Sequence, residues 1–326
     1  MLRTRLTALA AAAAALLALT GCSAGTSPST PDAGADDVIA INVGITPIIN
    51  AANVYVGIEE GIFERHGLDV TPVVVQNTST AIPSLINGEL QVALINAVAA
   101  VTAGSKGLPI QIVSGSDRYP TDPAEDTTAI VVKPDSGISD VTDLAGTTIA
   151  IVGLKSGPEL ATRVLLDEAG VDLASVNFVE LAYPDMVAAV EAGRVDAAFI
   201  VDPFLSNAKA AGLEVVAQPF TEGIGGMNAM TWVASESYLG ANAEAIERFT
   251  AAIQEAADFS NDNPESVRAV LPEFTTLSEA AIENAVLGRY DSSLSVEDLE
   301  AWSAILVKYG FIEEEFDTSG LIWHKP

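Results

Sequence analysis

Residues 87–95 read NGELQVALI, and residues 192–200, at an offset of 105, read AGRVDAAFI. In both stretches a glycine stops a helical pattern and an apolar strand follows. Two further pairs repeat at offsets of 105 and 103: Gly107-Leu108 with Gly212-Leu213, and Gly67-Leu68-Asp69-Val70 with Gly170-Val171-Asp172-Leu173. Chance similarity between generic segments is the weaker interpretation, because the pairs occur in register. The sequence therefore predicts two lobes of similar topology.

Short apolar runs alternate with helical patterns on both sides of these stretches. The predicted strands are Ile39–Ile45, Val70–Val75, Gln91–Ile95, Ile110–Ser114, Ala129–Val132, Thr148–Val152, Asn177–Glu180, Asp196–Ile200, Glu214–Ala217 and Met230–Ala234. Predicted helices between them include Tyr55–Arg65, Thr80–Asn87, Pro158–Glu168 and Met186–Ala192. Continuous apolar strands separated by helices are typical of parallel sheets that helices cover on both faces. The expected fold class is α/β, with a mainly parallel sheet flanked by helices in each lobe.

The pattern changes at Gln218-Pro219, after the second copy of the repeat. Helical stretches without a counterpart follow over Ala243–Asn261, near Ser278–Leu287 and over Val296–Tyr309. We expect these helices to cover the first lobe, so that the chain crosses between the lobes twice, near Ala129–Val132 and near Met230–Ala234. The expected lobe I spans residues 38–130 and 228–326, and lobe II spans residues 131–227.

The chain begins with a pattern typical of an exported lipoprotein. A basic start is followed by the weakly apolar run Leu6–Leu19, which is too short and too rich in alanine for a membrane span of about 20 residues. Residues 19–22 read LTGC and resemble the bacterial lipobox, in which cleavage leaves a lipid-modified cysteine; the alternative is a chance cysteine in an ordinary signal peptide. We expect a signal peptide over residues 1–21, lipidation of Cys22, a flexible tether over residues 22–37, and a location at the outer face of the cytoplasmic membrane.

The charge of the chain excludes one class of partner. The net charge is −29, and removal of Arg3 and Arg5 with the leader leaves 13 basic against 44 acidic residues, or −31. So acidic a surface repels phosphate backbones, which argues against nucleic-acid binding. Because 49% of the residues are hydrophobic and 18% are charged, the sequence nevertheless indicates a globular protein.

The sequence offers little for catalysis, metals or cofactors. One cysteine excludes an internal disulfide and a thiolate-rich zinc site, and two histidines make a multi-histidine metal site improbable. The Gly-x-Ser-x-Gly, phosphate-loop and His-Glu-x-x-His motifs do not occur. We therefore predict no catalytic residues, no metal and no cofactor.

The loops at the carboxyl ends of the predicted strands are the natural place for a ligand. In the first lobe they carry Thr46 and Asn50, then Asn77, Thr78 and Ser79, then Asn96, and finally Ser114. In the second lobe they carry Lys155, Ser156 and Gly157, then Tyr183, then Asp202 and Phe204. Most of these residues are small and neutral and bear a hydroxyl or an amide. This chemistry suits capture of a small polar molecule by hydrogen bonds.

Several of these residues also have a purely structural interpretation. Ser156 and Glu159 fit a capping box, yet a glycine-containing helix start beside Lys155 also suits an anion. Asp202 fits a helix N-cap, and if it faces a cleft instead it would select an amine or another hydrogen-bond donor. Tyr183 and Phe204 could stack on a planar ligand or simply belong to the packing.

Three motifs carry a resemblance to a known class of proteins. Residues 56–70 read VGIEEGIFERHGLDV, which resembles a segment of the solute-binding proteins for nitrate, sulfonates, taurine and thiamine precursors. Residues 135–138 with 143–146 (DSGI, DLAG), and residues 189–197 (AVEAGRVDA) leading to residues 202–204 (DPF), are similar to the same proteins. The match extends from about Ile41 to Gly212.

The resemblance implies a two-lobed fold of the periplasmic-binding-protein type II, with two crossovers at a hinge. It implies a receptor that closes over a small-molecule ligand and delivers it to an ABC permease with its ATPase. By position, it implies ligand contacts at Thr46, Asn77, Thr78, Ser79, Asn96, Ser114, Ser156, Gly157 and Asp202. One branch of the class is an enzyme with a cysteine-rich motif, which does not fit a chain whose one cysteine is Cys22.

The expected function is therefore a lipid-anchored, monomeric solute-binding protein that is not an enzyme. The alternatives are an exported enzyme, for which Asp202 is the one good acid candidate, and a ligand sensor on the same scaffold. Because few arginines lie in the loops, we expect a neutral, zwitterionic or amine-bearing ligand, such as a taurine-like sulfonate or an aminopyrimidine; flavins and nitrate stay open.

Overall fold

The computed structural model describes residues 38–75, 78–202, 204–275 and 277–325. The expected signal peptide, Cys22 and the tether lie outside these residues, as do Asn77 and the side chains of Thr78 and Ser79. None of the helices within these ranges combines the length and the apolar character that a bilayer span requires.

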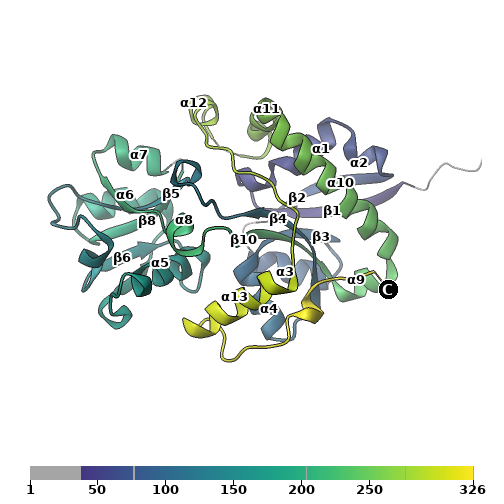
Figure 1. Cartoon of the computed structure of the whole chain (residues 1–326). Helices are drawn as coiled ribbons and strands as arrows, with labels where there is room; N and C mark the ends of the chain where they lie inside the picture. Colours follow the sequence, from purple (N-terminus) through teal and green to yellow (C-terminus); the bar gives the residue numbers. More distant parts are fainter. Residues whose placement is uncertain (1–37, 76–77, 203, 276, 326) are drawn as a thin grey trace, which may run out of the picture. The chain divides into compact units, whose positions relative to one another are not determined.

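The first sheet has five strands in the order β2-β1-β3-β10-β4 (Figure 1). Their bounds are β1 Ile39–Ile45, β2 Leu68–Val74, β3 Val92–Asn96, β4 Ile110–Arg118 and β10 Asn228–Ser235. β1 pairs in parallel with β2 and β3, whereas β10 is antiparallel to β3 and β4. Every residue of β10 is buried, as expected for a central strand covered on both faces.

The second sheet has five strands in the order β7-β6-β8-β5-β9. Their bounds are β5 Thr128–Val132, β6 Thr148–Ile151, β7 Asn177–Glu180, β8 Ala197–Val201 and β9 Glu214–Ala217. β6 pairs in parallel with β7 and β8, and β5 is antiparallel to β8 and β9. When β1 to β4 are matched with β6 to β9, and β10 with β5, the two sheets have the same strand order. The prediction of two lobes of similar topology is confirmed.

The mainly parallel sheets expected from the sequence are confirmed, and β5 and β10 are the antiparallel strands in them. Both strands are fully buried and rich in apolar residues, as buried parallel strands are. Their sequences therefore do not reveal that they run antiparallel to their neighbours. Their direction is reversed because each follows a crossing between the sheets. The sheets are therefore mainly parallel, with one antiparallel strand in each.

The chain crosses between the two sheets in the segments 119–127 and 218–227. A lobe boundary at residue 130, as expected from the sequence, would fall inside β5, whose residues from Thr128 to Val132 all pair with β8. The two crossing segments touch each other: the Tyr119 N–H donates to the Met227 carbonyl at 2.9 Å, and the Gly226 N–H donates to the Tyr119 carbonyl at 2.9 Å. Two chain segments bonded side by side form the connection between the lobes.

Helices flank both sheets (Figure 1). Those of the first lobe are α1 Ala52–Glu59, α2 Ile62–Arg65, α3 Thr78–Ile86, α4 Ala97–Ser105, α9 Glu236–Ala241, α10 Ala243–Asp262, α11 Pro264–Phe274, α12 Glu279–Glu283 and α13 Val296–Lys308. Those of the second lobe are α5 Gly157–Glu168, α6 Tyr183–Glu191, α7 Phe204–Ala210 and α8 Pro219–Ile224. The single helix expected over Tyr55–Arg65 is wrong, because Gly61 adopts a left-handed conformation (φ 64°) and separates α1 from α2.

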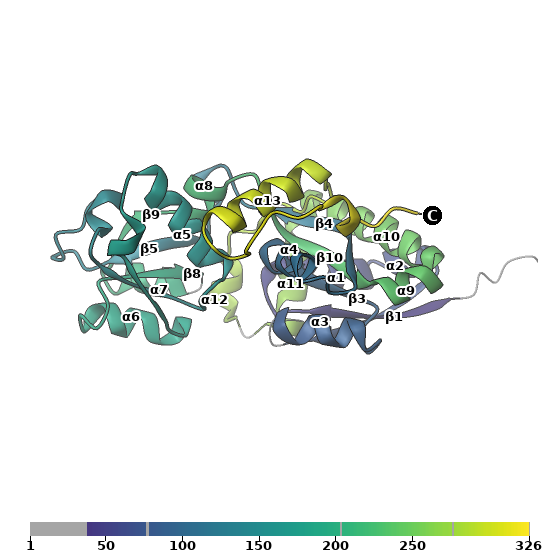
Figure 2. The same ribbon diagram turned by 90° about the horizontal axis from the view of Figure 1, so that it is seen from below.

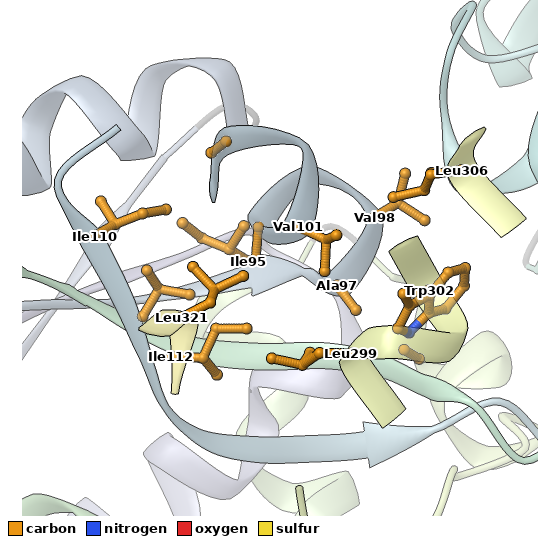
Figure 3. Packing of buried hydrophobic residues seen from close by; sticks show 14 of the residues in the cluster. Ile95, Ala97, Val98, Val101, Ile110, Ile112, Leu299, Trp302, Leu306 and Leu321 are labelled. Carbon is orange, nitrogen blue, oxygen red and sulfur yellow. The ribbon is translucent and has the colours of Figure 1, made fainter. Parts of the chain in front are cut away.

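The C-terminal helices cover the first sheet, as expected. α10 packs against α1, and α13 packs against α4; Figure 2 shows α13 running beside α4. In the core beneath them, Leu299, Trp302 and Leu306 of α13 share one apolar cluster with α4 and with Ile112 of β4. Figure 3 shows Leu306 next to Val98 within this cluster. Burial of these side chains fixes the C-terminal region on the first lobe.

A short segment before α13, residues 290–293, lies against β4. The Gly115 N–H donates to the Ser292 carbonyl at 3.1 Å, and the Asp291 N–H donates to the Ser116 carbonyl at 2.9 Å. Tyr290 forms an isolated antiparallel bridge with Asp117. The carboxyl end of β4 is therefore paired on both edges, with β10 on one side and with residues 290–293 on the other.

Replacing Gly115 by alanine is expected to destabilise the protein by about 1–3 kcal/mol, the range for overpacked sites. A Cβ at Gly115 would overlap the Ser293 carbonyl oxygen and lie 3.1 Å from that of Asp291. Urea denaturation followed by circular dichroism measures the change. Gly153→Ala is the control, because no atom lies within 4 Å of its added Cβ. Equal stability of the two variants would contradict the packing of residues 290–293 on β4.

Candidate functional site

Polar side chains meet at the carboxyl ends of β1, β3 and β4. We call Asn50, Asn96, Asp117, Tyr119 and Met230 the carboxyl-edge cluster. Asn50 lies in the 3-10 turn Ile49–Ala51 that follows β1, Asn96 is the last residue of β3, and Asp117 and Tyr119 lie at the end of β4. Met230 of β10 lies opposite both Asn96 and Asp117. This is the edge at which open α/β sheets bind ligands.

Asn96 links β3 to the rest of the cluster. Its Oδ1 accepts from the Val98 N–H at 3.0 Å and caps α4, and its Nδ2 donates to the Tyr119 hydroxyl at 3.2 Å. The sulfur of Met230 lies 4.0 Å from the same Nδ2. Burial raises the pKa of the Tyr119 hydroxyl, which therefore stays protonated and can donate in turn. The side chain expected to hold a ligand at this position thus also caps α4.

Asp117 is a buried carboxyl group with neutral partners. Its side chain accepts from the Asn50 amide and from the Met230 N–H, the latter at 2.9 Å. Burial raises the pKa of Asp117 to about 7, although both hydrogen bonds act in the opposite direction. A carboxyl group with a pKa near 7 gains or loses its proton when the pH changes slightly around neutrality. Such groups are typical of functional sites.

The second lobe approaches the cluster through the start of α5. A Cβ added to Gly157 would lie 3.1 Å from the Tyr119 hydroxyl and 3.7 Å from Asn96 Nδ2. Because Gly157 has no side chain, the backbone of the second lobe comes close to the side chains of Tyr119 and Asn96 in the first lobe. Of the residues expected to bind a ligand from the second lobe, Gly157 lies against the cluster, and Tyr183 is near enough for its charge to add to the burial that raises the pKa of Tyr119.

The expected capping box of α5 is wrong. Ser156 occupies the N-cap position, but its hydroxyl makes no capping bond and is buried with no partner among the described residues. Glu159 instead accepts from the Lys155 N–H at 2.6 Å and pairs with Arg163 at 2.6 Å. Glu159 is therefore engaged by Lys155, whose backbone has a left-handed φ of 55°, and by Arg163, instead of by the N-cap residue. The Lys155 ammonium donates to the Gly310 carbonyl at 3.3 Å, in the turn after α13.

Asp202, Tyr183 and Phe204 have local partners in the second lobe. The Asp202 carboxylate accepts from the Ser206 N–H at 3.0 Å and from its hydroxyl at 2.8 Å, which is the capping role weighed for it. The Tyr183 and Phe204 rings stack on each other with centroids 5.9 Å apart and planes 20° apart. These three residues serve the structure of α6 and α7 in the described state.

Thr46 and Ser114 differ in their relation to the cluster. Thr46 follows β1 directly and is half-buried. Ser114 was expected in a loop, but β4 continues to Arg118, so Ser114 lies within the strand. Its hydroxyl donates to backbone carbonyls, including that of Ser292 at 3.3 Å. The prediction for Ser114 as a strand-end residue is wrong, because pairing with β10 and with residues 290–293 extends β4.

Asp117 and Tyr119 were missed by the sequence analysis. The end of β4 has the polar sequence Ser114-Gly-Ser-Asp-Arg118, which does not have the pattern of a strand. It forms a strand by pairing with residues more than 100 positions away in the chain. The available signal was an acid and an aromatic residue, Asp117 and Tyr119, within six residues of the apolar run that ends at Val113. Within the described residues there is no group of three or more His, Cys, Asp or Glu side chains placed to hold a metal ion.

The lobes also meet away from the cluster. Asp167 of α5 pairs with the Lys308 ammonium at 2.7 Å and accepts from the Tyr309 hydroxyl at 3.0 Å, both at the end of α13. Lys308, as the nearest donor, holds the pKa of Asp167 below its usual value. These contacts join the second lobe to the C-terminal helix of the first.

Comparison with known proteins gives relatives that are named as binding proteins. A Brucella abortus protein named as a presumed binding protein is 26% identical over 275 residues, which cover 82% of this chain and 81% of the relative. The formylaminopyrimidine-binding protein of Halalkalibacterium halodurans is 24% identical over 222 residues, which cover 67% of this chain and 64% of the relative. Both matches favour a binding protein over the enzyme alternative.

Solved structures agree on the fold. The periplasmic aliphatic sulphonate binding protein SsuA of Escherichia coli superposes with a TM-score of 0.74 at 18% identity, covering 88% of this chain and 92% of that protein. The two-lobed α/β fold expected from the sequence is thereby confirmed. The family model described as "NMT1/THI5 like" matches residues 48–267, more than half of the 326 residues. The chain belongs to the NMT1/THI5-like family.

Proposed function

We propose that this protein is a lipid-anchored, monomeric solute-binding protein that captures a small polar organic molecule between its two lobes and delivers it to an ABC importer. The observation that carries the proposal is the carboxyl-edge cluster with Gly157 of the second lobe against it. Hydrogen-bonding side chains from β1, β3 and β4 meet the start of a helix from the other lobe there. Closure of two lobes around such a place removes polar ligand groups from water.

The ligand classes follow from the chemistry of the cluster and from the relatives. The relatives named for a ligand bind a formylaminopyrimidine and aliphatic sulphonates. Amide, hydroxyl and carboxyl groups of the cluster suit the donors and acceptors of an aminopyrimidine or of a taurine-like aminosulfonate. The absence of a lysine or arginine side chain from the cluster argues against a doubly charged anion.

A thermal-shift screen tests the ligand classes. Aminopyrimidines, taurine, alkanesulfonates, flavins and nitrate are added to the purified protein, and hits are measured by titration calorimetry. A ligand at 100 times its Kd stabilises the folded protein by about 2.7 kcal/mol, which is a clear shift in Tm. A shift with an aminopyrimidine or aminosulfonate supports the proposal. No shift with any of these compounds would refute the proposed ligand classes.

Replacing Gly157 by valine is expected to weaken binding of the hit from this screen at least tenfold. The added side chain would press on the Tyr119 hydroxyl and on Asn96, and so keep the start of α5 away from the cluster. Titration calorimetry measures the effect, and Gly153→Val is the matched control in the same loop. Unchanged affinity in Gly157→Val would show that the ligand lies elsewhere.

Replacing Cys22 by alanine is expected to release the protein from the membrane fraction of a bacterial host. The lipobox-like sequence ending at Cys22 supports lipidation, and two acyl chains or more are needed for stable anchoring. Fractionation and mass spectrometry of the mature N-terminus measure the outcome. A wild-type protein that carries no lipid on Cys22 would contradict the anchoring part of the proposal and leave ligand binding untouched.

A further inference from the structure

We infer that Asp117 selects the charge of the ligand, and that the carboxyl-edge cluster binds the protonated nitrogen of an amine-bearing molecule. The inference rests on the proposed function and narrows its ligand class. It favours aminosulfonates and aminomethylpyrimidines over plain alkanesulfonates and nitrate. Three features of the structure support this role of Asp117: it lacks a counter-ion among the described residues, adjoining residues carry unpaired polar groups, and Asp202, the other acid candidate, is engaged by Ser206.

Asp117 has no cationic partner among the described residues. It is 6% exposed, and its hydrogen-bond donors are the Asn50 amide and a backbone N–H. The neighbouring Arg118 is engaged elsewhere, because its guanidinium pairs with Asp291 and Asp298, each at 3.1 Å. A buried carboxylate without a counter-ion is costly, so a cation brought by a ligand would be bound strongly there.

The titratable groups that face Asp117 supply no positive charge. Tyr119 follows it at the end of β4, and Tyr290 bridges it from the segment beside β4. Burial raises the pKa of both hydroxyls, so both stay neutral. From the 3-10 turn and from β10, the groups in contact are the Asn50 amide and the Met230 backbone, which do not titrate. Tyr183 and Asp126, whose charges add to the effect of burial on the pKa of Tyr119, supply no positive charge either.

Two residues that adjoin Asp117 or its bridging partner Tyr290 carry buried polar groups without a partner among the described residues. Asn53, on the first turn of α1, is 1% exposed, and its side-chain oxygen and nitrogen have no partner among the described residues. Its backbone N–H bonds to the Tyr290 hydroxyl, so it touches the residue that bridges Asp117. The Ser116 hydroxyl, also 1% exposed, is unpaired as well. Each buried group without a partner is unfavourable. A ligand N–H would satisfy the Asn53 Oδ1 or the Ser116 Oγ, whereas the Asn53 Nδ2 needs a ligand acceptor.

Asp202 does not compete for this role. It is the acid that the sequence suggested for amine selection. However, the N–H and the hydroxyl of Ser206 both donate to the same carboxylate oxygen of Asp202. A local cap holds Asp202 in the second lobe, whereas Asp117 belongs to the carboxyl-edge cluster, whose Tyr119 and Asn96 lie against Gly157. The amine preference expected from the loops therefore belongs to Asp117.

Calorimetry with matched ligand pairs tests the inference. Taurine is compared with ethanesulfonate, and an aminomethylpyrimidine with the hydroxymethylpyrimidine of the same ring. In the wild type, the amine-bearing member of at least one pair is expected to bind at least tenfold more tightly. In Asp117→Asn this preference falls below about threefold, because the amide carries no charge, while Asp202→Asn keeps it. Retention of the preference in Asp117→Asn overturns the inference.

The wild type alone provides a second test. Taurine stays cationic at its nitrogen between pH 6 and pH 8, and the pKa of Asp117 is raised to about 7. Its affinity is therefore expected to rise by about tenfold over this interval, since a larger fraction of Asp117 is ionised. A flat profile for every amine that binds overturns the inference. Tighter binding of the amine-free partners overturns it too but leaves the proposed function intact, whereas failure of every probe to bind overturns the proposed ligand classes themselves.

Discussion

Replacing Trp302 by alanine is expected to lower the free energy of unfolding by about 3–5 kcal/mol, the usual loss for a buried tryptophan. The side chain is 0% exposed and lies in the apolar cluster between α13, α4 and β4 (Figure 3). Its indole N–H donates to the Asn228 carbonyl at 3.2 Å, and its ring meets that of Tyr119 edge-on at 6.2 Å. The cavity would therefore loosen both the C-terminal helix and the end of β4.

Urea denaturation followed by far-UV circular dichroism measures this loss. Trp323→Ala is the matched control, because Trp323 is only partly buried, at the edge of the cluster around β1 and α10. Its loss is expected to be less than half that of Trp302→Ala. If the two substitutions cost the same, α13 is not anchored by Trp302 in the way described.

Replacing Asp117 by asparagine is expected to stabilise the ligand-free protein, and more so as the pH rises from about 4 to about 7. The folded-state pKa of Asp117, about 7, lies above its ordinary value of 3.8, chiefly because of burial. In this interval the folded protein holds a proton that the unfolded chain has lost, so wild-type stability falls with pH until the folded-state pKa is passed. A shift of roughly three units corresponds to at most about 4 kcal/mol.

The free energies of unfolding of the wild type and of Asp117→Asn are measured from pH 4 to pH 8. Their difference reports the titration of Asp117 alone. Met230→Leu is the control, because it keeps the backbone N–H that binds Asp117 and removes no titrating group. Its difference curve is expected to stay flat. A flat curve for Asp117→Asn as well would show that the carboxyl group is ionised throughout, or that water reaches it freely.

The sequence predicts strands well where apolar character and burial coincide. The strand Ile39–Ile45 was predicted with the bounds that the structure gives, because its apolar run ends at Thr46 and carries buried residues of the first sheet. The direction of β5 and β10 was not accessible, since direction depends on the crossing between the lobes. α4 was missed as well, because its alanine- and glycine-containing sequence has no clear polar face.

The candidate site was predicted in part. Asn50 and Asn96 follow strands whose ends the apolar pattern marks, and the structure brings both into the carboxyl-edge cluster. Asp117 was not predicted as a site residue, because residues 290–293 define the end of β4. No local sequence pattern connects these residues to β4. Asp202 caps a helix because Ser206 donates two hydrogen bonds to its carboxylate. Such bonds, rather than the residue type, decide between capping and ligand binding.

The order of the strands along the chain has a consequence for biosynthesis. The second sheet is built from the continuous stretch 128–217, whereas the first needs β10, residues 228–235, to be placed between β3 and β4. As the chain emerges with its N-terminus first, the second lobe has all five strands of its sheet once residue 217 is free. Until residue 235 follows, β3 and β4 lack the strand that joins them. The lobe that begins first is therefore the last to close its sheet.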